Sequence, residues 1–214
     1  MKAGVVAVQG DVSEHAAALE RAAAVRGRRA DVIEIRESGL VPDCDALLLP
    51  GGESTAISRL LRSEGIDREI RDHVAAGNPV LATCAGLIVA SRDAKDDRVE
   101  TLELLDVSVD RNAFGRQRDS FEAPIDVTGL DEPFPAVFIR APAVDAVGPD
   151  VEVLATWDGA PVAVRQGPVT GTAFHPELTD DDRIHGLALF DEAGTASDDG
   201  TGGDAVSAES STAE

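Results

Sequence analysis

The sequence contains no tyrosine, one tryptophan, one methionine and only two cysteines in 214 residues. Two cysteines, Cys44 and Cys84, are too few for a disulfide framework, so we expect a reducing compartment and place the protein in the cytoplasm. No apolar run approaches the ~20 residues needed to span a bilayer. The N-terminus does not follow the pattern of a signal peptide. We therefore expect neither a disulfide-stabilised secreted domain nor a membrane-spanning protein.

Lysine is scarce as well, because only Lys2 and Lys95 contribute to the 19 basic residues. Against them stand 40 acidic residues, and the net charge is −21. Such a charge disfavours nucleic acid and anionic membranes as partners, since both are polyanions. Acid excess with little lysine and few aromatics is typical of proteins from salt-rich cytoplasms, where screening reduces self-repulsion. We expect a halophilic source; the alternative is an ordinary acidic protein with a charged tail.

The last 24 positions, residues 191–214, differ in composition from the rest of the chain. They hold seven acidic residues, no basic residue, and mainly glycine, serine, threonine and alanine. Such a segment has little to bury, so we expect a disordered acidic tail. Residues 1–190 then form one domain, which still carries −14 once the tail's seven charges are removed from −21.

Apolar runs alternate with helical patterns along this domain. Continuous apolar strands between helices indicate a mainly parallel sheet covered on both faces. We therefore predict an α/β fold, a three-layer sandwich in which functional loops follow the carboxyl ends of the strands. Strands are expected at 5–8, 31–35, 46–49, 79–82, 105–109, 121–127, 137–140, 151–157, 162–166 and 169–174, and helices at 13–25, from 54, from 67, at 85–91 and at 180–190.

Cys84 lies between an expected buried strand and an expected helix, with small neighbours Ala85 and Gly86. A tight strand-to-helix turn forces such a side chain outward, as in a nucleophile elbow. The start of a helix also favours thiolate and offers backbone N–H groups to an oxyanion. The alternative is a small buried apolar residue, which is the usual role of a free cysteine.

The tripeptide His175-Pro176-Glu177 supplies the groups that a cysteine nucleophile needs. Residues i and i+2 of an extended segment point the same way, and proline favours extended geometry before it. A carboxylate beside an imidazole fixes its tautomer and stabilises its charged form, so Cys84 gains a base and an orienting group. The alternative is a polar turn. The other histidines lie in helical patterns and are interpreted as surface or core residues: His15, His73 and His185.

Gly51 and Gly52 follow a strand of three leucines. Two glycines allow backbone N–H groups to approach a ligand closely. The alternative is a plain strand-to-helix turn with Ser54 as N-cap. A phosphate-binding loop is only weakly indicated, because no lysine follows at the required spacing. Cys44 has no matching partner in the sequence and is interpreted as structural.

Taken together, these motifs resemble the class I, triad-type glutamine amidotransferases, and most closely the glutaminase subunits of pyridoxal 5′-phosphate synthases. The resemblance covers nearly all of residues 1–190. It rests on Val8-Gln9-Gly10 with Glu14-His15, LPGGEST at 49–55, TCAGLI at 83–88, RNAFGRQRDSFE at 111–122, FIRAP at 138–142 and FHPELTDD at 174–181. One position departs from the family pattern, because Ala82 stands where glycine is usual; alanine is small, so we expect activity to be retained.

The resemblance implies a flavodoxin-like sheet and assigns the chemistry. Cys84 attacks the side-chain amide of glutamine, His175 transfers the proton to the departing ammonia, and Glu177 orients His175. Backbone N–H groups of Gly52 and Ala85 form the oxyanion hole. Glutamine binding is assigned to Gly51, Gly52, Glu53, Arg111, Ile139 and Arg140. For the two arginines, the alternative is a surface ion pair in an acidic protein.

The resemblance also implies a partner, a (β/α)₈-barrel synthase subunit that makes pyridoxal 5′-phosphate from ribose 5-phosphate, glyceraldehyde 3-phosphate and the channelled ammonia. We expect low activity until that partner docks, and no metal or organic cofactor. Combined with the composition, the resemblance indicates a halophilic archaeon as source. Two alternatives remain: a glutaminase or Cys-His hydrolase serving another pathway, such as histidine or purine synthesis, or a catalytically silent regulatory subunit. The segment at 111–122 disfavours the first, and the intact triad disfavours the second.

Overall fold

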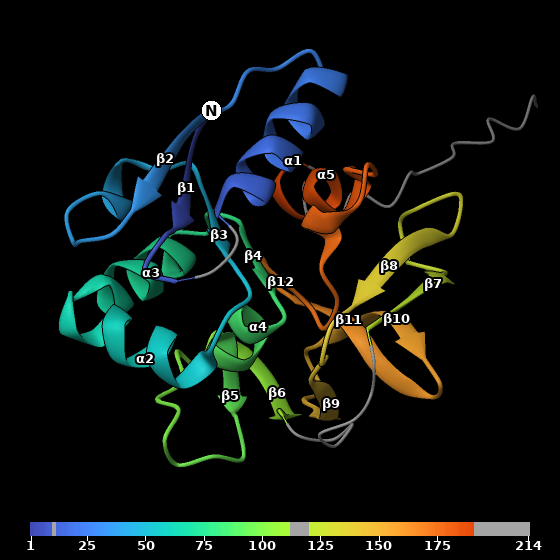
Figure 1. The fold of residues 1–214 in the computed structure, drawn as a ribbon. Helices are drawn as coiled ribbons and strands as arrows, with labels where there is room; N and C mark the ends of the chain where they lie inside the picture. Colours follow the sequence, from blue (N-terminus) through green and yellow to red (C-terminus); the bar gives the residue numbers. More distant parts are fainter. Residues whose placement is uncertain (10–11, 112–119, 191–214) are drawn as a thin grey trace, which may run out of the picture.

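The computed structural model describes residues 1–9, 12–111 and 120–190 (Figure 1). The predicted acidic tail, residues 191–214, lies outside the described residues. A seven-stranded sheet forms the centre, with the strand order β10-β11-β12-β4-β3-β1-β2. The strands span Lys2–Val6 (β1), Asp31–Ile35 (β2), Ala46–Leu49 (β3), Val80–Thr83 (β4), Glu152–Trp157 (β10), Ala160–Gln166 (β11) and Val169–Thr172 (β12). The five strands from β12 to β2 run parallel, and β10 and β11 are antiparallel, so the predicted mainly parallel sheet is confirmed.

Helices cover both faces of this sheet, as the three-layer prediction requires (Figure 1). On one face α1 (Val12–Val25) packs against α5 (Arg183–Leu189). On the other face α2 (Ser54–Ser63) packs against α3 (Ile66–Ala75) and α4 (Ala85–Ala90). In the part of the chain that the structure describes, no helix combines the length and the apolar character needed to cross a membrane.

The central strands form where the sequence has continuous apolar runs. All four residues of β3 and of β4 are buried, which is the pattern of strands covered on both faces. The predicted bounds of β2 and β3 are confirmed. The first strand was expected at 5–8 but spans Lys2–Val6, because its pairing with β2 begins at Lys2 and ends at Val6.

Two small sheets flank the central one. One contains β5 (Ser91–Asp93), β6 (Leu105–Asp110) and β9 (Ala143–Val147), and the other pairs β7 (Phe121–Ile125) with β8 (Phe134–Phe138). β5 and β9 were not predicted, since most of their residues are exposed and their sequences lack an apolar run. The strand predicted at 137–140 is β8, which ends earlier because Arg140 has a φ of 45° and leaves the extended region. The described residues also form two 3₁₀ turns, η1 (Val41–Asp43) and η3 (Pro176–Leu178).

An aromatic cluster fixes the β7–β8 hairpin against the segment that follows β12. Phe121 stacks on Phe138 with ring centroids 4.7 Å apart, and Phe138 meets Phe174 edge-on at 5.7 Å. Such pairs stabilise a core beyond the area they bury. Next to them, the N–H of His175 donates to the carbonyl of Val137 over 2.8 Å. The hairpin therefore holds the backbone on which His175 lies.

Candidate active site

The order of the central strands brings the three predicted functional loops together. β4 lies between β3 and β12, with Leu49 beside Ala82 and Thr83 beside Thr172. Because these strands are parallel, their carboxyl ends meet at one edge of the sheet. The loops that follow them carry Gly51, Cys84 and His175. The structure thus assembles from distant parts of the chain what the sequence predicts separately.

Cys84 occupies a sharp turn between β4 and α4. Its φ of 49° and ψ of −105° are unfavourable for a residue with a side chain. The turn is held by its N–H, which donates to the carbonyl of Thr172 over 2.8 Å. Gly86 makes the close approach possible, since a Cβ at this position would lie 2.0 Å from the carbonyl oxygen of Leu49. The turn has the geometry of the predicted elbow.

His175 lies between Cys84 and Glu177. Its Nδ1 is 2.6 Å from Oε1 of Glu177, and both side chains are buried. Burial alone would lower the pKa of His175, but the hydrogen-bonded side chains of Cys84 and Glu177 raise that pKa to about 10. The imidazole is therefore suited to hold a proton beside a thiolate. The three side chains have the relationship of nucleophile, base and orienting group.

Gly51 packs directly against this pair. A Cβ at Gly51 would lie 2.7 Å from Cε1 of His175 and 3.5 Å from Cβ of Cys84, so a side chain there would displace the ring. Gly52 has a φ of 140°, which favours glycine, and a Cβ on it would lie 3.1 Å from Oε1 of Gln9. The glycine pair thus leaves the backbone next to Cys84 and His175 free of side chains.

Glu53 is the N-cap of α2. Its carboxylate accepts from the N–H groups of Thr55, over 3.1 Å, and Ala56, over 2.7 Å. The alternative cap, Ser54, is wrong, because its hydroxyl is buried without a hydrogen-bond partner among the described residues. Partial burial would raise the pKa of Glu53, but the N–H groups of Ala56 and Thr55, together with Arg111, lower that pKa overall. Glu53 is therefore held as an anion at the helix start.

Arg111 lies beside Glu53, which brings together two residues predicted to bind glutamine. Its guanidinium donates to Oε1 of Glu53 over 3.1 Å, and to Thr55 Oγ1 over 3.0 Å and Asp96 Oδ2 over 3.1 Å. No pattern in the sequence selects Thr55 or Asp96 as partners of Arg111. Hydrogen bonds from Arg98, supported by Arg111, hold the pKa of Asp96 well below its usual range, so a fixed anion orients the Arg111 guanidinium. The rest of the motif at 112–119 lies outside the described residues.

Ile139 and Arg140 directly follow the end of β8. Ile139 is half-buried and Arg140 is exposed. Two positions earlier, Val137 accepts the hydrogen bond from the backbone of His175, which puts this end of β8 next to the candidate triad. Ile139 and Arg140 therefore lie near the site where glutamine binding is predicted. Among the described residues, no hydrogen-bond partner of their side chains is seen.

The two alanines next to Cys84 in the sequence have distinct surroundings. Ala82 is fully buried in β4, so the core accommodates the methyl group where glycine is usual. Ala85 is the first residue of α4, directly after Cys84. First-turn N–H groups have no intrahelical acceptor, so that of Ala85 is available to an oxyanion.

Two buried histidines lie behind Glu177. His15 of α1 places Nε2 3.5 Å from Oε2 of Glu177, and its Nδ1 is 3.2 Å from Nε2 of His185 on α5. Both were interpreted as surface or core residues, and both are in the core. The contact of His15 with Glu177 was not predicted. Nor was the contact between the two histidines, since helical segments 170 positions apart carry no sequence signal of contact. The third, His73, is also buried and lies near the carbonyl of Pro79.

Cys44 is buried, and its Sγ donates to the carbonyl of Leu40 over 3.4 Å. Burial raises the pKa of this thiol, which disfavours a reactive thiolate. The structural interpretation of Cys44 is therefore confirmed.

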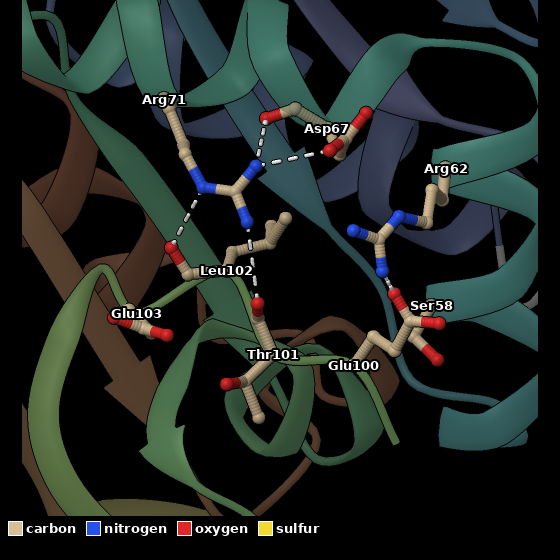
Figure 2. Close-up of a pocket in the computed structure, with 8 residues that line it drawn as sticks. All are labelled: Ser58, Arg62, Asp67, Arg71, Glu100, Thr101, Leu102 and Glu103. Atoms are coloured by element: carbon tan, nitrogen blue, oxygen red, sulfur yellow. Dashed lines mark hydrogen bonds and ion pairs between the residues drawn. The ribbon is translucent and has the colours of Figure 1, made fainter. Parts of the chain in front are cut away.

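A cavity of about 290 Å³ lies apart from the candidate triad, between α2, α3 and the segment before β6 (Figure 2). Arg71 donates across it to the carbonyls of Thr101 and Leu102 and to Asp67, and Arg62 pairs with Glu100. These contacts tie the loop at 100–103 to α2 and α3, so the cavity is a structural junction rather than part of the candidate catalytic centre. Its walls comprise Ser58, Arg62, Asp67, Arg71, Glu100, Thr101, Leu102 and Glu103.

Comparisons with known proteins agree with this geometry. The SNO glutamine amidotransferase family matches residues 5–191. The pyridoxal 5′-phosphate synthase subunit PdxT of Haloarcula marismortui is 74% identical over 191 residues, which cover 89% of this chain and 97% of the relative. The PdxT subunit of Methanosarcina acetivorans is 55% identical over 190 residues, covering 86% and 95%.

Solved structures show the same architecture. A crystal structure of a glutamine amidotransferase has a TM-score of 0.77 at 44% identity and covers 86% of this chain and 94% of its own. The PurLQS structure from Thermotoga maritima has a TM-score of 0.59 at 18% identity, covering 87% and 92%, and shows the fold alone.

Proposed function

The chain belongs to the SNO glutamine amidotransferase family, and from this premise we propose that it hydrolyses L-glutamine to L-glutamate and ammonia through Cys84, His175 and Glu177. The ammonia serves the synthesis of pyridoxal 5′-phosphate, in keeping with the relatives that are named as subunits of that synthase. One observation carries the proposal: Cys84 lies on a strained elbow at the sheet edge that also carries an imidazole, whose Nδ1 is 2.6 Å from a buried carboxylate.

Acylation begins when His175 takes the proton of the Cys84 thiol. The thiolate sulfur attacks the amide carbon of the glutamine side chain, and the carbonyl electron pair moves onto oxygen. When this tetrahedral intermediate collapses, the carbon–nitrogen bond breaks and His175 returns the proton to nitrogen, which leaves as ammonia. Glu177 keeps Nδ1 of His175 protonated and stabilises the imidazolium between the two transfers.

Deacylation repeats these transfers with water. His175 removes a proton from water, whose oxygen attacks the γ-glutamyl thioester. The carbon–sulfur bond then breaks, glutamate is released and the thiol of Cys84 is restored. In both halves we assign the oxyanion to the backbone N–H groups of Gly52 and Ala85, since a charge that develops only in the transition state is stabilised best by fixed donors.

We assign recognition of the glutamine backbone groups to Gly51, Gly52, Glu53, Arg111, Ile139 and Arg140. Anchored by Glu53 and Asp96, the guanidinium of Arg111 has five N–H donors and is suited to a carboxylate. Glu53 contributes a fixed negative charge for the substrate ammonium. Ile139 and Arg140 would border the substrate from the end of β8.

Free ammonia is lost to water, so the proposed reaction requires an acceptor subunit. The names of the relatives imply a synthase partner. We propose that the partner is a (β/α)₈ barrel that combines ammonia with ribose 5-phosphate and glyceraldehyde 3-phosphate, and that docking raises the glutaminase activity. We further propose that the domain spans 1–190, that 191–214 is an acidic tail, and that the protein acts in the cytoplasm.

Steady-state glutamate release, measured in molar KCl with and without the synthase subunit of the same source, tests the proposal. Wild-type protein should hydrolyse glutamine faster when the synthase is present, and Cys84→Ala should be inactive in both conditions. Glutaminase activity that increases with a different synthase instead would assign the protein to another biosynthetic pathway. No hydrolysis under any condition would support the alternative of a silent regulatory subunit.

A further inference from the structure

A buried pair of histidines that the proposed mechanism does not use lies behind the triad. His15 and His185 are both 0% exposed. They belong to α1 and α5, which lie side by side over the sheet (Figure 1). His15 Nε2 is 3.1 Å from Thr83 Oγ1, directly before Cys84 in the chain, and 3.5 Å from Oε2 of Glu177.

The second oxygen of Glu177 needs a donor. Its Oε1 faces His175, whereas Oε2 is buried and receives no hydrogen bond from the described residues. A buried anionic oxygen without a donor is unfavourable. His15 Nε2, at 3.5 Å, is positioned to supply that donor after a small approach.

Only one proton arrangement of the histidine pair suits this carboxylate. If His15 carries its proton on Nε2, it donates toward Glu177 and Thr83, and its Nδ1 accepts from Nε2 of His185 over 3.2 Å. The unpartnered Nδ1 of His185 is then a bare acceptor. In the opposite arrangement, His185 would bury an N–H donor without an acceptor and His15 would turn a lone pair toward the carboxylate. The first arrangement is therefore preferred.

Both histidines are neutral in this arrangement. Burial, then His185 and His175, lowers the pKa of His15 well below its usual value. Burial, then the charge of Arg21, lowers the pKa of His185 to about 3. The positive charge that balances Glu177 therefore stays on His175. Within the described residues, no group of three or more His, Cys, Asp or Glu side chains is arranged to hold a metal ion.

We propose that His15 is a positioning residue for the triad: its Nε2–H holds Oε2 of Glu177, which keeps Oε1 on His175, and His185 fixes the tautomer of His15. The inference rests on the proposed function, because it acts through Glu177. A carboxylate held at both oxygens cannot rotate away from the imidazole during the two proton transfers. His15 should therefore affect turnover and not the binding of glutamine.

Two substitutions of His15 separate the donor from the rest of the side chain. The amide nitrogen of glutamine can take the place of Nε2, whereas that of asparagine can take only the place of Nδ1. In the complex with the synthase subunit, His15→Asn should lower kcat by about 10- to 100-fold with little change in KM, since small misplacements of catalytic groups have effects of that size. His15→Gln should restore kcat to within about threefold of wild type. Equal loss in both variants would overturn the proposal.

A double-mutant cycle tests whether His15 acts through Glu177. The rate of Cys84 alkylation by iodoacetamide, followed by the mass of the peptide that contains it, reports on the triad without glutamine. His15→Asn should slow alkylation in the wild-type background but change it less than about twofold in Glu177→Gln. The same slowing in both backgrounds would show a general structural effect and overturn the proposal.

Melting temperatures in molar KCl show whether each variant folds. If His15→Asn does not fold, His185→Leu decides instead. It should lower kcat because the tautomer of His15 is no longer fixed, and an unchanged kcat would overturn the proposal. A separate comparison tests the proposed function itself. If the wild-type protein hydrolyses glutamine no faster than Cys84→Ala, the proposed function is wrong. The alkylation cycle still tests His15 in that case.

Discussion

Gly51 has no side chain, and the imidazole ring of His175 occupies the space that a side chain at this position would fill. A Cβ at position 51 would lie 2.7 Å from Cε1 of this imidazole, closer than such atoms approach in proteins. The ring is buried and its Nδ1 is hydrogen-bonded to Glu177, so it cannot move without losing its alignment. The glycine is therefore required by the position of the imidazole, and not by a left-handed backbone.

Gly51→Ala should consequently lower kcat of glutamine hydrolysis by about 10- to 100-fold, because the imidazole moves away from the thiol. Gly77→Ala is a suitable control. Gly77 has a φ of 85° and nothing within 4 Å, so alanine there should cost about 1 kcal/mol of stability and leave kcat unchanged. Wild-type turnover in Gly51→Ala would contradict this account of the site.

The backbone of Cys84 stores strain that a second substitution can release. At a φ of 49°, glycine is favoured over any residue with a Cβ. Both Cys84→Ala and Cys84→Gly should abolish hydrolysis, but the glycine variant should be more stable than the alanine variant by about 1 kcal/mol. Urea denaturation in molar KCl measures the difference. An alanine variant of equal or higher stability would show that the elbow is unstrained.

The buried histidine on α5 should make the protein sensitive to acid. The folded-state pKa of His185 is lowered to about 3, whereas the unfolded chain titrates near 6.5. Between these values the unfolded state binds a proton that the folded state does not, so stability falls as the pH drops from about 6.5 toward about 3. His185→Leu should remove up to about 1.4 kcal/mol per pH unit of that slope. Identical slopes for the two proteins, measured by denaturation across this range, would contradict the assignment.

Two arginines of the cavity in Figure 2 should differ in their contribution to stability. Arg71 donates to two backbone carbonyls of the facing loop, those of Thr101 and Leu102, whereas Arg62 forms a surface ion pair with Glu100. Arg71→Ala should lower the free energy of unfolding by about 1–3 kcal/mol, because two backbone carbonyls, one of them on the buried Leu102, lose a charged donor. Arg62→Ala should cost less than about 1 kcal/mol. Equal costs would show that Arg71 does not anchor the loop.

The charge of −21 should make stability rise with salt. The melting temperature should increase as KCl is raised to molar concentrations. A chain ending at residue 190 should show most of the same increase, since the tail carries only seven of the negative charges. A melting temperature that is independent of KCl would contradict the halophilic interpretation, which the relatives from Haloarcula, Halorubrum and Halobacterium support.

The buried part of the fold was predictable from the sequence. β3 is four consecutive apolar residues, and its bounds follow from that run alone. β9 has one buried residue among five, and its position depends on pairing with β6, which a local pattern does not record. The end of β8 was also mispredicted, because it depends on the positive φ of Arg140, which a local apolar pattern does not reveal.

The site shows a similar division. Cys84, His175 and Glu177 stand in short motifs at strand ends, where local sequence and local geometry coincide. Asp96 reaches Arg111 only through the tertiary structure. His15 was matched as part of a motif, but its contact with Glu177 depends on the packing of α1 against the loop after β12. Such tertiary contacts join residues that are not related by a regular spacing in the sequence, so a local pattern does not predict them.

The covalent intermediate on Cys84 tests the central claim most directly. Wild-type protein in complex with the synthase subunit is mixed with glutamine, quenched in acid within milliseconds and digested, and its peptides are weighed. The account predicts one γ-glutamyl group as a thioester on the peptide that contains Cys84, none on the peptide with Cys44, and none anywhere in Cys84→Ala. A γ-glutamyl group at another residue, or glutamate release by Cys84→Ala at the wild-type rate, would contradict it.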